Sequence, residues 1–106
     1  MSSAAFSRNE QMEGRRETKR STRLKADLLD RLAKVEGQIR GIKRMIEDDM
    51  YCDDILNQIT AVHSALSAVR NLLLENHIKS CVRESIERKE YEIVDELMRT
   101  LKRMFK

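Results

Sequence analysis

The stretch "CDDILNQITAVHSALSAVRNLLLENHIKSC" (residues 52–81) decides the fold, because it is periodic and contains neither proline nor glycine. Its apolar residues alternate between spacings of four and three: Ile55, Ile59, Val62, Leu66, Val69 and Leu73. This spacing places apolar side chains along one face of an α-helix. No glycine or proline follows Gly41, so we expect the helix to continue to about Arg88.

A second amphipathic helix is predicted upstream of this stretch. It begins near Ser21 or Thr22, either of which can cap it. Its apolar stripe has the same periodicity: Leu28, Leu32, Val35, Ile39, Ile42 and Ile46. The segment "EDDMYCDD" (47–54) interrupts the pattern, and Asp48 or Asp49 is expected to cap the helix that follows.

Downstream, "ERKEYE" (87–92) is predicted to be a turn before a shorter third helix. The residues of that helix expected to face inward are Ile93, Val94, Leu97, Met98, Leu101 and Phe105. Met98 and Met104 are interpreted as core residues rather than copper ligands. The chain is therefore predicted to be all-α, with three helices in a single domain over residues 23–106. Residues 1–22 are predicted to be a disordered basic arm.

Composition and charge narrow the possible classes of protein. A chain of 106 residues with 37% charged and 4% aromatic residues has the composition of long helices. A helical monomer of this length buries a thin core, so association is expected. Residues 1–46 hold 12 Lys and Arg against 6 Asp and Glu, which favours a nucleic-acid partner, although a solvated basic surface explains the charge equally well. The absence of a membrane-spanning run and of an export signal predicts a cytoplasmic location, where cysteines are free thiols or metal ligands.

Three residues could bind a metal ion. His77 and Cys81 lie four positions apart, so both side chains can reach one ion from the same helix face. Cys52 lies 29 positions before Cys81, which corresponds to about 43 Å along a continuous helix. Cys52 can therefore share an ion with the other two residues only across two antiparallel copies of this helix.

The two-fold axis of such a dimer would cross the helix near residue 65. Small residues that would let two backbones approach gather there: Ala61, Ser64, Ala65, Ser67 and Ala68. His63 lies far from either end of the helix and is assigned to packing or to the surface. Two thiolates and one imidazole suit Cu(I), whereas zinc prefers a fourth ligand that the sequence does not offer.

Three segments, "RLAKVEGQIRGI" (31–42), "YCDDILNQITAV" (51–62) and "LLLENHIKSC" (72–81), resemble the copper-sensitive operon repressor (CsoR) family. The resemblance covers about residues 24–104 in order. It implies an all-helical antiparallel dimer with a four-helix bundle core, which assembles into a homotetramer as a dimer of dimers. It also implies that residues 23–106 form a single metal-sensing and DNA-binding domain and that the protein represses transcription.

The ligand pattern of that family is carried here by Cys52, His77 and Cys81. The related nickel and cobalt sensors use a histidine near the N-terminus and another in place of Cys81, and this chain has neither. The formaldehyde sensors lack the second cysteine, and the persulfide sensors lack the histidine. The resemblance therefore points to Cu(I), bound between subunits.

The resemblance also implies roles for residues outside this set. Tyr51, beside the first cysteine, and Glu96, on the third helix, would form an outer shell around the histidine ligand. Operator DNA, expected to be GC-rich, would be contacted through phosphates by basic residues of the first two helices rather than by a helix-turn-helix. These residues are Arg31, Lys34, Arg40, Arg44 and Arg70.

The function predicted from the sequence is that of a Cu(I)-responsive repressor, which binds operator DNA without metal and releases it when Cu(I) binds. Two alternatives stay open. One is a thiol or persulfide redox-sensing repressor that uses Cys52 and Cys81 as a cross-chain pair. The other is a copper-buffering protein that does not bind DNA. An enzyme is not expected, because the sequence offers no pair of nucleophile and base.

Overall fold

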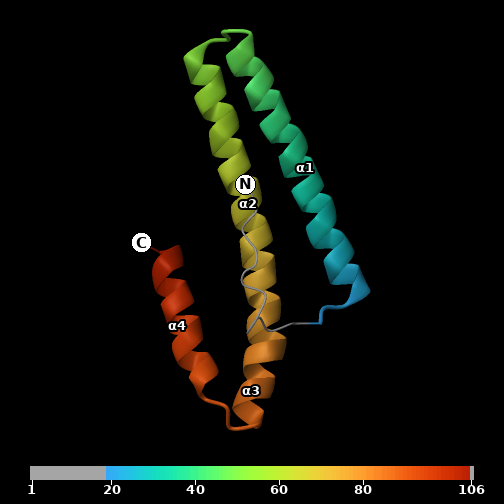
Figure 1. Cartoon of the computed structure of the whole chain (residues 1–106), viewed down its shortest axis with the longest axis vertical. Coiled ribbons are helices and arrows are strands. Elements are labelled where there is room, and N and C mark those ends of the chain that lie inside the picture. The colour runs from blue at the N-terminus through green and yellow to red at the C-terminus, as the bar shows by residue number, and fades with distance from the viewer. Residues whose placement is uncertain (1–18, 106) are drawn as a thin grey trace, which may run out of the picture.

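The computed structural model describes residues 19–105, and the elements in this range are helices joined by turns. α1 (Thr22–Glu47) and α2 (Cys52–His77) form an antiparallel hairpin. α2 continues through a five-residue π-helical turn, η1 (Ile78–Val82), into α3 (Arg83–Glu87). α4 (Glu92–Met104) then folds back beside the C-terminal part of this rod, on the side away from α1 (Figure 1). Since α2, η1 and α3 form one rod, the prediction of an all-α chain with three helices is confirmed.

The ends of the first helix and of the long rod follow local signals. Ser21 caps α1, because its Oγ accepts a hydrogen bond of 3.1 Å from the backbone N–H of Leu24. The rod ends at Glu87, and the turn that follows places Lys89 at a φ of 64°. Both the predicted cap and the predicted turn are thus confirmed. The predicted basic arm, by contrast, lies mostly outside the described residues.

The cap predicted for the second helix was wrong. Asp48 and Asp49 lie in the turn between α1 and α2, where Asp49 has a φ of 53°. Tyr51 occupies the N-cap position, and its backbone carbonyl accepts hydrogen bonds from the N–H groups of Asp54 and Ile55 at 3.1 and 3.3 Å. The acidic residues of the first turn face the positive end of the helix dipole, which stabilises the start of α2 without a side-chain cap from the turn.

The core between α1 and α2 is thin, as expected. Four side chains form its seam and are 5–8% exposed: Leu28, Val35, Val62 and Val69. Among the described residues, no side chain is less than 2% exposed. A neighbouring apolar stripe is 36–57% exposed and comprises Leu32, Ile39, Ile46, Ile59 and Leu66. Each helix therefore has a wider apolar face than its neighbour in the same chain covers. Within residues 19–105, no helix is long and apolar enough to cross a membrane.

α4 buries less of its apolar face than the sequence predicted. Ile93 is buried, and Leu97 and Leu101 are half-buried. Three residues predicted to face inward are instead exposed in the single chain: Val94, Met98 and Phe105. The prediction was wrong for these three because α4 packs against one rod only, and its apolar face is wider than that contact. Met104 is half-buried, as expected of a core residue.

Candidate metal centre

His77 and Cys81 lie where α2 passes into η1. His77 is the last residue of α2, Cys81 is a free thiol within η1, and both side chains are half-buried. The turn between them is π-helical, whereas the sequence predicted a continuous α-helix. A π turn pairs residues five positions apart and occurs frequently at functional sites. It widens the helix, so it changes the direction in which Cys81 points relative to His77.

An ion pair spans the same junction. Nζ of Lys79, in η1, lies 2.8 Å from Oε2 of Glu75, in α2, and both side chains are exposed. The hydrogen bond and the positive charge of Lys79 lower the pKa of Glu75 below its ordinary value. The pair therefore links the last turn of α2 to the first half of the π turn.

Cys52 lies at the opposite end of α2. It is the first residue of the helix, and its free thiol is exposed at the hairpin end. α2 runs without a break to His77, which places the two residues about 37 Å apart along the helix axis. Within residues 19–105, no group of three or more His, Cys, Asp and Glu side chains could hold a metal ion. The three predicted ligands are thus not brought together within one chain.

Cys52 and His77 nevertheless share one face of α2. At 3.6 residues per turn, the 25 positions between them make almost seven turns, so their side chains point in directions about 20° apart. Ile59 and Leu66 follow Cys52 at intervals of seven and belong to the same face, and both are exposed. The face that carries two of the predicted ligands is therefore an open apolar surface. Below it is called the ligand face.

An open hollow of about 310 Å³ lies midway along the ligand face, lined by His63, Leu66, Ser67 and Arg70. Its position matches the point near residue 65 where the sequence places a two-fold axis. Ser67 is one of the small residues predicted to surround that axis. Helical geometry places Ala61, Ser64 and Ala68 on the other side of α2, about 140–160° from Leu66, so the prediction that these three residues surround the axis does not fit a contact through the ligand face. The exposed His63 borders the hollow, in keeping with its assignment to packing or to the surface.

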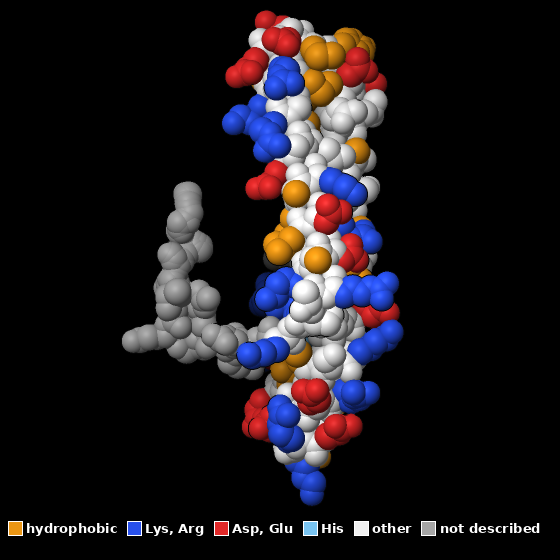
Figure 2. All heavy atoms as spheres, turned by 90° about the vertical axis from the view of Figure 1, so that its right-hand side faces the viewer, with side chains coloured by type: hydrophobic (Ala, Val, Ile, Leu, Met, Phe, Trp, Pro, Cys, Tyr) orange, Lys and Arg blue, Asp and Glu red, His pale blue; other side chains and the backbone are white. Residues whose placement is uncertain are grey.

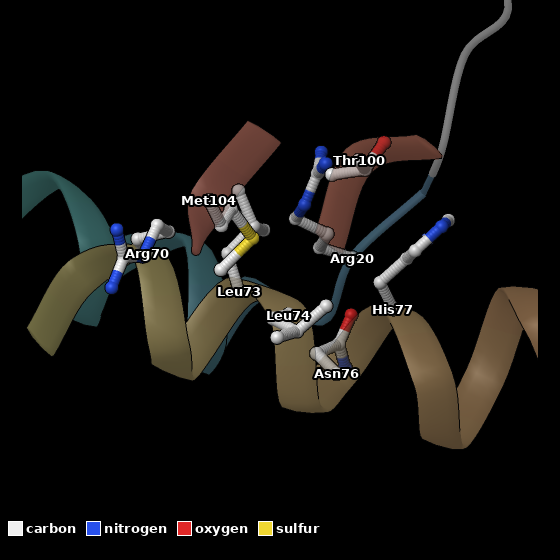
Figure 3. Close-up of a pocket in the computed structure, with 8 residues that line it drawn as sticks. All are labelled: Arg20, Arg70, Leu73, Leu74, Asn76, His77, Thr100 and Met104. Atoms are coloured by element: carbon white, nitrogen blue, oxygen red, sulfur yellow. The ribbon is translucent and has the colours of Figure 1, made fainter. Parts of the chain in front are cut away.

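The two residues predicted to form an outer shell lie towards opposite ends of the rod. Tyr51 is 73% exposed beside Cys52. Glu96 is half-buried on α4, one turn before Thr100. Thr100 and His77 line a second hollow, of about 270 Å³, between α2 and α4 (Figure 3). α4 thus carries Glu96 towards the His77 end, whereas Tyr51 belongs to the Cys52 end.

The hollow beside His77 also contains a residue that sequence reasoning missed. Arg20, in the segment before α1, extends its side chain towards Thr100 of α4 (Figure 3). Leu73, Leu74 and Met104 supply the apolar part of the lining. The sequence assigned Arg20 to the basic arm, and no local pattern distinguishes it from the other cations there. Its position depends on the packing of α4 against α2.

A family model of metal-sensitive transcriptional repressors matches residues 24–103. The chain belongs to this family. The copper-sensing transcriptional repressor CsoR of Bacillus subtilis is 41% identical over 88 residues, which cover 82% of this chain and 87% of that protein. The copper-sensing repressor RicR of Mycobacterium tuberculosis is 51% identical over 65 residues, 61% of this chain and 68% of that protein.

Solved structures of two transcriptional regulators with related sequences share the fold. The copper-sensing repressor CsoR with Cu(I) from Geobacillus thermodenitrificans has a TM-score of 0.80 at 38% identity, over 85% of this chain and 95% of that one. The nickel-responsive transcriptional regulator InrS has a TM-score of 0.65 at 32% identity, over 82% and 96%. The predicted family is thus confirmed: the chain is a metal-sensitive transcriptional repressor and not an enzyme.

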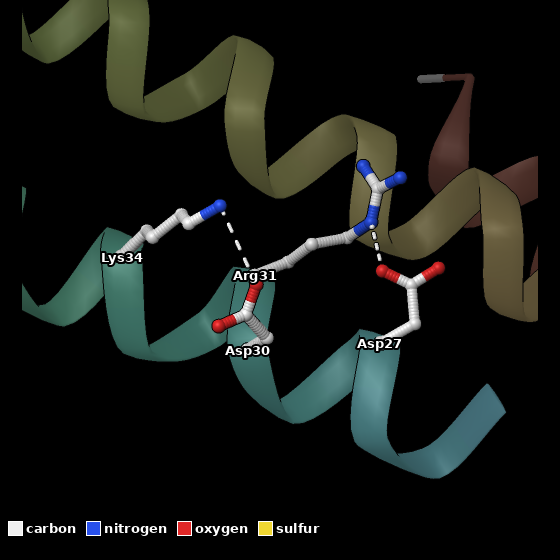
Figure 4. Close-up of polar contacts among 4 residues, drawn as sticks. All are labelled: Asp27, Asp30, Arg31 and Lys34. Carbon is white, nitrogen blue, oxygen red and sulfur yellow. Dashed lines mark hydrogen bonds and ion pairs between the residues drawn. The ribbon is translucent and has the colours of Figure 1, made fainter. Parts of the chain in front are cut away.

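Because a transcriptional repressor acts on DNA, the charge of α1 bears directly on function. Arg31 Nε lies 2.9 Å from Asp27 Oδ1, and Lys34 Nζ lies 3.4 Å from Asp30 Oδ2 (Figure 4). Each of these two predicted DNA-binding cations is therefore partly neutralised by a carboxylate of its own helix. Such exposed pairs are weak, so DNA phosphates can compete for the cations.

Arg70 differs from the other predicted DNA-binding residues in its location. Its Nε donates a 3.4 Å hydrogen bond to Asn71 Oδ1, and its side chain lines both hollows along α2. It therefore lies near the ligand face rather than beside the cations of α1. The role predicted for it stays a prediction.

Proposed function

We propose that this repressor responds to Cu(I), binding operator DNA in the metal-free state and releasing it when Cu(I) binds between two chains. One observation carries the proposal. Cys52 and the His77–Cys81 pair lie at opposite ends of one rod, and the ligand face that joins them is apolar and exposed. Two antiparallel copies of α2 packed through this face would bring Cys52 of each copy to His77 and Cys81 of the other.

The exposed apolar stripe supports this dimer. Leu32, Ile39 and Ile46 of α1, with Ile59 and Leu66 of α2, would be covered if two hairpins packed into an antiparallel four-helix bundle. Each fully buried Leu or Ile side chain contributes about 1.5–3 kcal/mol, so the stripe can stabilise a dimer considerably. Apolar residues exposed on α4 and at its C-cap offer a further surface, in keeping with a dimer of dimers: Val94, Met98 and Phe105.

The donor set favours copper over nickel. Cys52 of one chain and His77 and Cys81 of the other would hold Cu(I). The bound ion would then link the two chains, because no single chain brings the three ligands together. Thiolates are soft ligands that select Cu(I), and two of them with one imidazole suit its low coordination number. The relatives described above as copper-sensing are 38–51% identical to this chain. The nickel-responsive relative is 32% identical and has the lower TM-score.

Residues outside the ligand set would connect the metal to the DNA. Tyr51 of one chain and Glu96 of the other would approach the same His77 in the antiparallel dimer, where they could fix the orientation of its imidazole. α4 lies over the end of α2 that carries His77, so a change there can be passed to α4. Such coupling is worth typically about 1–3 kcal/mol.

The second candidate is a thiol-based sensor, and the exposure of Cys52 is what favours it. The proposed dimer would also place Cys52 near Cys81 of the other chain, where oxidation could join the two sulfurs. That chemistry does not need the imidazole, so the two candidates differ in their dependence on His77. In both cases we expect the protein to work in the cytoplasm.

The testing experiment is a fluorescence anisotropy titration of GC-rich promoter DNA under anaerobic, reducing conditions, with and without Cu(I). Cu(I) should weaken DNA binding, and Ni(II) at the same concentration should have a smaller effect. A persulfide donor in place of metal tests the second candidate. Release by Cu(I) that persists unchanged in His77→Ala would contradict the role given to the imidazole.

A further inference from the structure

The middle of the ligand face carries one arginine whose charge no described side chain compensates. Arg70 follows Cys52 by 18 positions, which is about five turns of α-helix, so the two side chains point in the same direction. From residue 55 to residue 74, α2 contains no Asp or Glu. Arg70 forms no ion pair with a described residue, and its Nε donates a 3.4 Å hydrogen bond to Asn71. The two hollows that it borders have no carboxylate among their lining residues.

The outer side of α1 has a different charge pattern. Lys and Arg side chains are interspersed there with Asp and Glu (Figure 2). Two of the cations of α1, Arg31 and Lys34, form ion pairs with carboxylates of the same helix. A cation on such a surface stays in water and close to opposite charge, so its own charge is screened. Arg70 lacks the nearby opposite charge, and the proposed dimer would also remove it from water.

Assembly through the ligand face would bury the charge of Arg70. This residue lies five positions, or about 8 Å along the helix, from the proposed two-fold axis near residue 65. Two arginines related by that axis would therefore approach each other within an apolar interface. Burial of a charge is costly unless an opposite charge accompanies it, and repulsion between two like charges adds to the cost. An anion at the centre of the dimer would remove this cost.

Side chains that can donate hydrogen bonds to an anion lie beside Arg70. His63 follows Cys52 by 11 positions and points within about 20° of it, on the other side of the proposed axis from Arg70. The hollow of about 310 Å³ at this point is lined by His63, Ser67 and Arg70, with Leu66 as its apolar member. An imidazole, a hydroxyl and a guanidinium each donate hydrogen bonds, and the guanidinium can bind an oxyanion through two parallel ones. The hollow therefore has the donors of an oxyanion site.

We propose that two copies of His63, Ser67 and Arg70 form an oxyanion site on the two-fold axis of the dimer, which binds phosphate or sulfate between the chains. The inference rests on the proposed function, because it requires the dimer packed through the ligand face. A tetrahedral anion has two-fold symmetry, so each chain can bind two of its oxygens with the same donors, whereas a carboxylate would offer each chain only one. Chloride has no pair of oxygens for the guanidinium fork. Arg70 would then serve the subunit interface rather than operator DNA.

Oxyanion binding by the metal-free, reduced protein tests the site. Inorganic phosphate and sulfate are titrated separately by isothermal calorimetry at constant ionic strength, with potassium chloride as the balancing salt. At least one of them should bind, with one ion for every two chains. Arg70→Met should weaken this binding at least tenfold, and Ser67→Ala should weaken it less. Arg23→Met, which removes an exposed cation of α1, is the matched control and should bind as the wild type does.

Three results of this titration would overturn the inference. The first is an assembled wild-type protein that binds neither phosphate nor sulfate. The second is a stoichiometry of one ion per chain, because a site on the axis is shared by two chains. The third is unchanged binding in Arg70→Met.

Sedimentation equilibrium separates a bound anion from any other partner of Arg70. The oxyanion should tighten association of the wild type, because a ligand that binds only the dimer stabilises it. Arg70→Met should associate at least as tightly as the wild type without oxyanion and should not respond to it, since an apolar side chain replaces a buried charge. Dissociation of Arg70→Met would show that Arg70 pairs with a carboxylate across the interface, and it would overturn the inference.

Failure of the inference and failure of the proposed function give different results. A wild-type protein that assembles and releases DNA with Cu(I) in oxyanion-free buffer, yet binds neither phosphate nor sulfate, would overturn the inference alone. A wild-type chain that stays monomeric with and without Cu(I) would contradict the shared metal site and the oxyanion site together.

Discussion

At the scale of single residues, the environments of the three proposed ligands differ. Cys52 is exposed at the hairpin end, whereas His77 and Cys81 are half-buried at a junction packed beside α4. His77 also lines the hollow that contains Arg20 and Thr100 (Figure 3). The imidazole is therefore the ligand best placed to pass a change to other elements. The two cysteines are better suited to supply affinity for the metal.

This division of roles predicts how the ligand variants behave. Cys52→Ala and Cys81→Ala should each lose most of the Cu(I) affinity, because each removes one of two thiolates. His77→Ala should still bind Cu(I), since two thiolates can hold the ion in a linear geometry, but it should release DNA less completely. Anaerobic competition with a Cu(I) chelator measures the first effect, and DNA anisotropy with saturating Cu(I) measures the second. Loss of Cu(I) affinity in His77→Ala as severe as in the cysteine variants would contradict the division.

The ion pair beside these ligands predicts a shifted titration. The hydrogen bond and charge of Lys79 should keep the pKa of Glu75 below its ordinary value, which NMR of the side-chain carboxyl can measure. Lys79→Met should return the pKa towards the ordinary value. The stability that the pair contributes is present above the ordinary carboxyl pKa and is lost as the pH falls through the lowered value. A Glu75 pKa that is the same in wild type and Lys79→Met would contradict the pairing.

At the scale of elements, the rod from α2 to α3 sets the distance between the two parts of the metal site. Its regularity from Cys52 to His77 keeps both residues on the ligand face, and the π turn then reorients Cys81. α1 is held against the rod by a narrow seam. The N-terminus of α1 is capped by Ser21, and the contribution of this cap to stability can be measured separately from assembly.

Removing that cap should destabilise α1 measurably. Ser21→Ala removes the hydrogen bond from the N–H of Leu24 to Oγ, and the free energy of unfolding should fall by about 1 kcal/mol. The nearby Thr22→Ala is a suitable control because Ser21 is the N-cap residue. Urea denaturation at one fixed protein concentration is the appropriate measurement, since association affects apparent stability. Equal stability of Ser21→Ala and the wild type would show that the cap contributes little.

The sequence predicted correctly the helices and helix ends that depend on neighbouring residues in the chain. Periodic apolar residues and the serine cap placed α1 within a residue of its observed start, and the absence of glycine and proline predicted the length of the rod. The cap at Asp48 or Asp49 was wrong because the backbone of the turn, with Asp49 at positive φ, removes both residues from the N-cap position. The π turn could not be predicted from local preference, since "IKSCV" (78–82) is compatible with an α-helix.

The candidate site was predictable only in part, for the same reason. The spacing of His77 and Cys81, and their separation from Cys52, follow from chain position alone. The placement of Arg20 beside His77 depends on the packing of α4, which is a contact between segments distant in the sequence. The pairs of Arg31 with Asp27 and of Lys34 with Asp30 follow from a spacing of four residues and are therefore local features that a sequence can predict.

At the scale of the whole molecule, the chain is an elongated hairpin with one return helix and an incomplete core (Figure 1). The stripe from Leu32 to Ile46 and the ligand face of α2 are both open in the single chain. The hairpin end combines an apolar tip, where Met50 and Tyr51 are 47% and 73% exposed, with the cations of α1. Assembly would therefore cover the stripe and the ligand face, which the single chain leaves open.

A charge placed on the ligand face should disrupt assembly. Leu66→Lys lies at the proposed two-fold axis, so both copies in a dimer would lose about 2 kcal/mol of apolar burial and gain a repulsive pair. Leu29→Lys is the matched control, because Leu29 is 60% exposed on α1 and lies outside the stripe. Analytical ultracentrifugation should show dissociation for Leu66→Lys and wild-type association for Leu29→Lys. The reverse pattern would place the subunit contact elsewhere.

The most direct test of the central claim mixes two inactive chains. Differently tagged Cys52→Ala and Cys81→Ala chains are co-expressed, and heterodimers carrying both tags are purified and titrated anaerobically with Cu(I). If each site combines Cys52 of one chain with His77 and Cys81 of the other, the heterodimer contains one intact site and one that lacks both cysteines. The heterodimer should then bind one Cu(I) with wild-type affinity, while neither homodimer does. A heterodimer that binds no Cu(I) with that affinity would contradict a site shared between chains.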